Sequence, residues 1–160
     1  MKYSAHLCVI LILTSGIPSG RAQSSNELSA ASAQKIIEGC VADATAKKQS
    51  HAIAVVDGSG SLLAFVRMEG NPPGVGEFAI QKAEAAAAWR FSTAQMSEAA
   101  KDTPGFANAP GVTTVPGGVP LYVPHGPFLG AVGVSGEAPA DDASCAMAGI
   151  SAAGFSQGNP

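Results

Sequence analysis

The side chains best suited to chemistry lie in the second half of the chain. Lys82 stands within an apolar, alanine-rich segment beside a loop rich in glycine and proline, where an ammonium group could hold an anionic ligand. The alternative is a surface lysine whose stem packs on the protein while its amine reaches water. His125 lies between Pro124 and Gly126 in a predicted turn. Imidazole binds metals, so His125 is a candidate iron ligand, against the alternative of a solvated turn residue.

Two further side chains near this segment could line a pocket. Phe91 closely follows the alanine-rich segment, where a ring could form a flat apolar wall for an aromatic ligand. Met68 precedes the Pro-Pro-Gly loop and could adapt its shape to a ligand. Both residues are core side chains in the alternative interpretation.

Established catalytic and metal motifs are absent from the sequence. The segment 133–136 begins like a nucleophile elbow, but its fifth position is Glu137 where that motif needs glycine. There is no His-Glu-x-x-His, no Cys-x-x-Cys and no phosphate-binding glycine loop. These absences disfavour a serine hydrolase, a zinc enzyme and a nucleotide-binding protein.

The first residues are typical of an export signal. Lys2 precedes an apolar run over residues 5–13, and Ala22 ends a segment with small residues at the positions that a signal peptidase prefers. We therefore expect a signal peptide over 1–22 and a polar linker over 23–27; the alternative is a retained N-terminal anchor. The mature protein is then expected to be periplasmic or secreted and to lack a membrane span, because no other apolar run approaches about 18 residues.

Charge argues against nucleic acid as a partner. Removal of residues 1–22 lowers Lys plus Arg from 9 to 7 and leaves Asp plus Glu at 12, so the net charge changes from −3 to −5. Nucleic-acid phosphates require clustered lysine and arginine, and an acidic chain without such a cluster does not supply them.

Cys40 and Cys145 remain after removal of the leader. An exported compartment permits a disulfide between them, whereas two buried thiols are the alternative. Two sulfur ligands alone do not make a structural zinc site.

The hydrophobic pattern predicts one α+β domain over residues 28–156. Apolar residues at helical spacing over 33–44 predict a first helix that turns Cys40 inward, with Ser29 as its N-cap. Two strand pairs flanking turns imply an antiparallel sheet. The other elements are predicted as strands at 51–56, 62–68, 121–123 and 128–134, helices at 78–89 and 93–100, loops at 69–76 and 101–114, and a last helix capped by Asp141 or Asp142.

The chain resembles the GlcG/HbpS family over about 28–155. The matching pieces are 53–58, 63–68, Pro72-Pro73-Gly74, 80–83, 115–120, 130–136 and Asp142-x-x-Cys145. The C-terminal domain of PduO-type corrinoid adenosyltransferases is also similar. The resemblance implies a profilin-like, five-stranded antiparallel sheet flanked by helices. It also implies that the first and last helices share one face, which favours a Cys40–Cys145 disulfide, and that the protein is a homo-oligomer.

The same resemblance implies a small-molecule ligand, with haem or a related tetrapyrrole as the expected cofactor. Carried over residue by residue, it adds the glycine pair of the Pro-Gly-Gly turn and the threonines before it to the side chains above. A threonine in this segment resembles the haem-contacting position of HbpS. The expected ligand-binding set is Met68, Lys82, Phe91, Thr113, Thr114, Gly117 and Gly118.

The sequence therefore leaves three alternative functions open. The first is an exported haem- or tetrapyrrole-binding protein without a catalytic group. The second is an accessory or assembly protein without a ligand. The third is an enzyme acting on a small aromatic or hydroxy-acid compound, with Lys82 or His125 as its acid–base group.

Overall fold

The structure, a computed structural model, describes residues 27–158. The predicted signal peptide and residues 23–26 of the linker lie outside this range. Two pairs of consecutive strands are separated by two helices and flanked by one helix on each side. The elements are α1 (Ala30–Lys47), β1 (Ala52–Asp57), β2 (Leu62–Arg67), α2 (Pro73–Trp89), α3 (Thr93–Asp102), a 3-10 turn (Phe106–Asn108), β3 (Gly118–Tyr122), β4 (Phe128–Ser135) and α4 (Pro139–Ala152).

The sheet is antiparallel throughout, with the strand order β2-β1-β4-β3. The α+β class is confirmed, but the fifth strand that the resemblance implied is wrong for residues 27–158, which form a four-stranded sheet. Beside the edge strand β3, the described chain makes one isolated bridge, between Tyr122 and Ser156.

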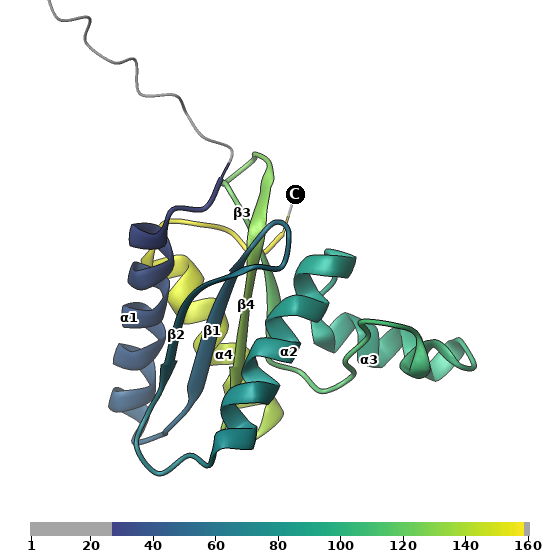
Figure 1. Ribbon diagram of the computed structural model, residues 1–160, viewed down its shortest axis with the longest axis horizontal. Helices are drawn as coiled ribbons and strands as arrows, with labels where there is room; N and C mark the ends of the chain where they lie inside the picture. Colours follow the sequence, from purple (N-terminus) through teal and green to yellow (C-terminus); the bar gives the residue numbers. More distant parts are fainter. Residues whose placement is uncertain (1–26, 159–160) are drawn as a thin grey trace, which may run out of the picture.

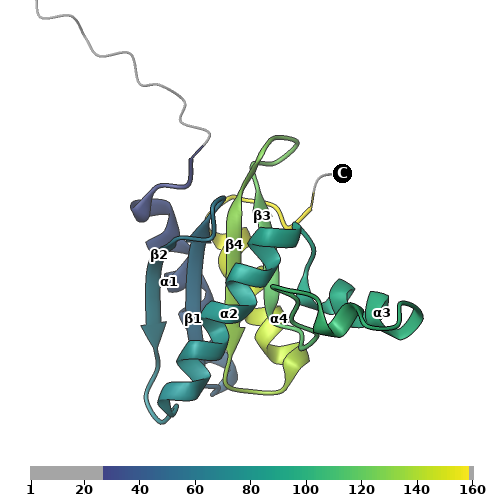
Figure 2. The same cartoon turned by 45° about the vertical axis from the view of Figure 1, so that its right-hand side comes forward.

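Helices cover the two faces of the sheet unequally. Figures 1 and 2 show α1 and α4 together on one face and α2 on the other. Because side chains alternate along a strand, Ile53 and Val55 of β1 pack toward α1 and α4, whereas Ala54 packs toward α2. Small side chains on the α2 side let that helix approach the sheet closely. A Cβ at Gly133 would lie 2.0 Å from the carbonyl oxygen of Ala79.

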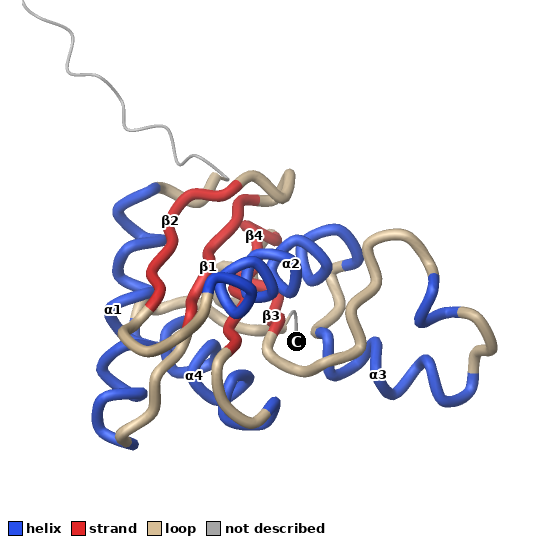
Figure 3. Tube along the Cα trace, turned by 60° about the horizontal axis from the view of Figure 1, so that its bottom comes forward, coloured by secondary structure: helices blue, strands red, loops and turns tan. Residues whose placement is uncertain are grey.

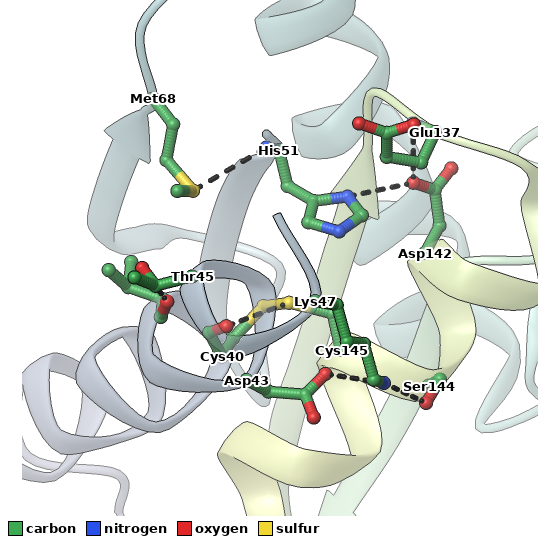
Figure 4. The surroundings of a disulfide bond; sticks show 11 residues. Cys40, Asp43, Thr45, Lys47, His51, Met68, Glu137, Asp142, Ser144 and Cys145 are labelled. Carbon is green, nitrogen blue, oxygen red and sulfur yellow. Dashed lines mark hydrogen bonds and ion pairs between the residues drawn. A yellow bond between two sulfur atoms is a disulfide. The ribbon is translucent and has the colours of Figure 1, made fainter. Parts of the chain in front are cut away.

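A disulfide joins α1 to α4. Cys40 and Cys145 are both fully buried and bonded, 105 residues apart in sequence. Figure 4 shows the bond between the two helices. The pairing implied by the resemblance is confirmed, as is Ser29 as the N-cap of α1, where its side chain accepts from the Ser32 N–H.

Two helices begin earlier than predicted, each at a proline. α2 starts at Pro73 rather than at residue 78, so the predicted loop over 69–76 is wrong in its second half. α4 starts at Pro139 with Ala138 as its N-cap, so the prediction that Asp141 or Asp142 caps it is also wrong. Proline favours the first helical position because its fixed φ suits a helix and it lacks the N–H that would go unpaired there.

Beyond α2 the chain leaves the sheet. Figure 3 shows α3 and the turn after it projecting away from the strands. Ser92 caps α3 and exchanges hydrogen bonds with Gln95 in a capping box. Within residues 27–158 no helix is both long and apolar enough to cross a membrane.

Candidate functional site

Three ionisable side chains meet in the interior at one end of the sheet. Lys82 of α2 donates to Asp142 Oδ2 of α4 at 2.8 Å and to the Val134 carbonyl oxygen at 2.9 Å. His51 directly precedes β1, and its Nδ1 atom lies 3.1 Å from Asp142 Oδ1. All three residues are at most 2% exposed. A single carboxylate therefore links the helical layers on both faces of the sheet.

Asp142 is also bonded to the backbone that leads into its helix. The Glu137 N–H donates to Asp142 Oδ1 at 3.1 Å, and Glu137 Oε1 in turn accepts from the Ser50 N–H at 3.0 Å. Figure 4 shows His51 and Glu137 both meeting the same oxygen of this carboxylate, Oδ1. The second imidazole nitrogen of His51, Nε2, is buried without a hydrogen-bond partner among the described residues. The cluster is closed to solvent, so its first effect is to hold β1, β4 and α4 together.

The glycine pair at the start of β3, Gly117 and Gly118, makes room for Lys82. A Cβ at Gly117 would lie 2.7 Å from Lys82 Nζ, and one at Gly118 would lie 2.3 Å from the Lys82 carbonyl oxygen. The Gly118 N–H donates to the buried Thr93 hydroxyl at 2.9 Å, which fastens the start of α3 to the start of β3. The Lys82 side chain therefore extends past the backbone of two residues without side chains to reach Asp142.

Replacing Gly118 with alanine is expected to lower the free energy of unfolding by at least about 1–3 kcal/mol, because the new methyl group would meet backbone that cannot move independently. Chemical denaturation measures the change. Gly74→Ala is the matched control, since a Cβ at this exposed position has no neighbour within 4 Å. We expect Gly74→Ala to leave stability unchanged or slightly raised; equal losses in both variants would contradict the packing described here.

A cavity of about 300 Å³ opens on the outer side of this glycine pair. We call it the α3–β3–α4 cavity. Its floor is the backbone of Gly117 and Gly118, and Met147, 37% exposed, stands in its wall. The lining contains no charged side chain; it consists of Ser92, Ala94, Gln95, Gly117, Gly118, Val119, Ala143, Met147 and Gln157.

Two other cavities of similar size carry acids. One of about 270 Å³ lies between α2 and the 111–113 segment, and Glu84 and Thr113 line it. The other, of about 400 Å³, lies at the β1–β2 turn, where Glu27 and Asp57 line it. The hydroxyl of Ser59 donates to Asp57 at 2.6 Å and lowers the pKa of Asp57 below its ordinary value of 3.8, so this carboxylate is ionised at neutral pH. Both cavities are therefore poor sites for an anion.

The structure brings together only part of the expected ligand-binding set. Lys82, Gly117 and Gly118 are in contact, and Phe91, 48% exposed, immediately precedes Ser92 at the rim of the α3–β3–α4 cavity. Lys82 lies behind the glycine floor and is not the surface lysine that the sequence also allowed.

The remaining expected residues lie elsewhere. Thr113 is buried in the Glu84 cavity, and Thr114 beside it is half-buried. Met68 is half-buried against the α1 side of the core, and its sulfur accepts from the His51 N–H at 3.5 Å. His125 is exposed with a φ of 55° at the tip of the β3–β4 hairpin, at the opposite end of β3 from Gly118.

Sequence reasoning missed His51, Asp142 and Met147. Asp142 was interpreted as a helix cap, and neither His51 nor Met147 was assigned a role. Helical spacing gives one usable signal: Ala143 and Met147 are four residues apart, so they lie on one face of α4, and both line the cavity. Within residues 27–158 no group of three or more His, Cys, Asp or Glu side chains is placed to hold a metal ion.

Comparisons with known proteins agree with this fold. A family model described as "Haem degrading protein HbpS-like" matches residues 28–151. Protein GlcG of Escherichia coli (strain K12) is 38% identical over 109 residues, which are 68% of this chain and 81% of that protein.

Two solved structures superpose on most of the chain. A crystal structure of HbpS has a TM-score of 0.72 and 26% identity, covering 85% of this chain and 96% of its own. A crystal structure of a PduOC:haem complex has a TM-score of 0.75 and 24% identity, covering 82% of this chain and 98% of its own, and at that identity it supports the fold alone.

Proposed function

This chain belongs to the HbpS-like family, and on that premise we propose that it is an exported protein that binds haem or a related tetrapyrrole in the α3–β3–α4 cavity. The single observation that carries the proposal is the cavity itself. It has an uncharged, largely apolar wall, a floor of bare glycine backbone and a partly exposed thioether.

The chemistry of this lining fits one edge of a tetrapyrrole. Ligand sites are mostly apolar with a few placed polar groups and usually span about 300–1,000 Å³, so 300 Å³ is at the lower limit. A macrocycle would therefore enter by its apolar edge and leave its propionates in water.

Electrostatics favours this cavity over the other two. Haem carries two propionates, and Glu84 in one competing cavity and the ionised Asp57 in the other would repel them. The family description, which names haem, supports haem as the ligand class.

Two features support export. The N-terminal residues have the pattern of a signal peptide, and disulfides such as Cys40–Cys145 persist in oxidising compartments. We further propose that the mature protein is periplasmic or secreted and forms a homo-oligomer, which native mass spectrometry would count. An enzyme using Lys82 as its acid–base group has less support, because Lys82 is 1% exposed and ion-paired.

A haem titration followed by visible absorption tests the proposal. We expect the purified protein to shift the Soret band of added haem and to saturate at a fixed haem-to-protein ratio. Ala143→Trp, which fills the α3–β3–α4 cavity, is expected to weaken binding at least about tenfold, or about 1.4 kcal/mol.

Ala88→Trp is the matched control, because Ala88 lines the Glu84 cavity and its replacement leaves the α3–β3–α4 cavity open. Wild-type affinity is expected for this variant. A wild-type protein that leaves the haem spectrum unchanged would refute haem binding, and loss of binding in Ala88→Trp alone would move the site to the other cavity.

A further inference from the structure

We propose that the Met147 thioether is the protein's axial ligand to the iron of bound haem. The inference rests on the haem-binding function proposed above and assigns the iron contact to a residue in the same cavity. Methionine sulfur is one of the side-chain donors that haem iron accepts. The bond formed is a dative one, from a sulfur lone pair to iron, and no electron or proton is transferred.

Accessibility removes most alternative donors among the described residues. His51 is fully buried, and its Nδ1 is engaged by Asp142. Met96 is also fully buried, and Cys40 and Cys145 are consumed by their disulfide.

The accessible alternatives do not line the α3–β3–α4 cavity. His125 is exposed at the far hairpin tip, where no cavity described above reaches it. Tyr122 packs edge-on against Phe128 at 5.4 Å between ring centroids, and its backbone pairs with Ser156. Met68 is half-buried on the α1 side of the core.

Met147 is both accessible to solvent and part of the lining of the α3–β3–α4 cavity, unlike the residues above. It lines the α3–β3–α4 cavity, and at 37% exposure it is one of the large apolar side chains left in contact with water. It projects from α4, which the Cys40–Cys145 disulfide and the Asp142 cluster hold in place. A flexible thioether on a fixed helix can adjust to iron without disturbing the backbone.

The test is absorption and magnetic circular dichroism of the purified protein with ferric haem. In the wild-type protein we expect the weak long-wavelength charge-transfer band that accompanies thioether ligation of ferric haem. Met147→Leu keeps the volume and removes the sulfur donor. We expect it to abolish that band and to weaken haem binding about tenfold. Met147→His is expected to replace that band with the spectral features of imidazole ligation.

Met68→Leu is the matched control, and its spectrum is expected to equal that of the wild-type protein. A wild-type spectrum without the thioether band, or a Met147→Leu spectrum that retains it, would overturn the assignment while haem binding stands. No Soret shift with any variant would instead refute the proposed function and the assignment with it. Far-UV circular dichroism of each variant establishes that it is folded.

Discussion

Asp142→Asn is expected to lower the free energy of unfolding by about 3–5 kcal/mol. The substitution removes the carboxylate that, within residues 27–158, is the one paired with the Lys82 ammonium. Lys82 is 1% exposed, so it has no access to water in place of the lost partner. Breaking a buried pair by removing one partner leaves an uncompensated charge, and that cost exceeds the value of the pair itself. Urea denaturation at neutral pH measures the loss.

The neighbouring acid provides the control. Asp141 stands in the same first turn of α4 but is only partly buried and has no ion pair among the described residues, so Asp141→Asn is expected to cost less than about 1 kcal/mol. Adding Lys82→Met to Asp142→Asn is expected to recover part of the loss, because it removes the stranded charge. Equal losses for the two asparagine variants would show that the buried pair does not have the assigned role.

Removing the disulfide has the second large effect. Cys40→Ala combined with Cys145→Ala is expected to destabilise the protein by about 2–5 kcal/mol. The bond closes a loop with a sequence separation of 105, and in the chain-entropy model a loop of that length restricts the unfolded chain by nearly the largest amount in this range. Thermal or urea unfolding of the oxidised wild-type protein and the double variant gives the difference.

Access to the sulfurs provides a separate check. Both cysteines are fully buried, so the reductant is expected to open the bond only when the chain unfolds. Wild-type protein unfolded with reductant and then measured under reducing conditions should match the double variant. If the oxidised protein and the double variant unfold at the same denaturant concentration, the bond does not contribute as described.

Most of the elements could be predicted from the sequence, because local signals specify them. The apolar stripe with Ser29 before it marks α1, and the Asp-Gly-Ser-Gly turn marks the β1–β2 hairpin. The start of α2 was missed because Pro72, Pro73 and Gly74 are helix breakers in isolation. Gly76 of α2 lies close to the Phe65 ring of β2, where an added Cβ would be 3.0 Å away, so this part of the helix packs on the sheet through a contact that the local sequence does not show.

The candidate site was harder to predict, because its contacts join distant parts of the chain. Lys82 and Asp142 are separated by 60 residues and His51 and Asp142 by 91, so no local pattern relates them. An aspartate near the start of a helix, such as Asp142, can serve either as an N-cap or as an ion-pair partner, so its position alone does not distinguish the two roles. The resemblance to a family motif indicates that the glycine pair matters, but only the packing shows that the glycines leave space for Lys82.

A crystal structure of the purified protein with haem added tests the proposed site most directly. We predict electron density for the macrocycle over the Gly117–Gly118 floor, between Ser92, the N-cap of α3, and Met147 of α4. Density in the Glu84 cavity or at the Asp57 turn, or a structure without bound haem at saturating concentration, would contradict that prediction.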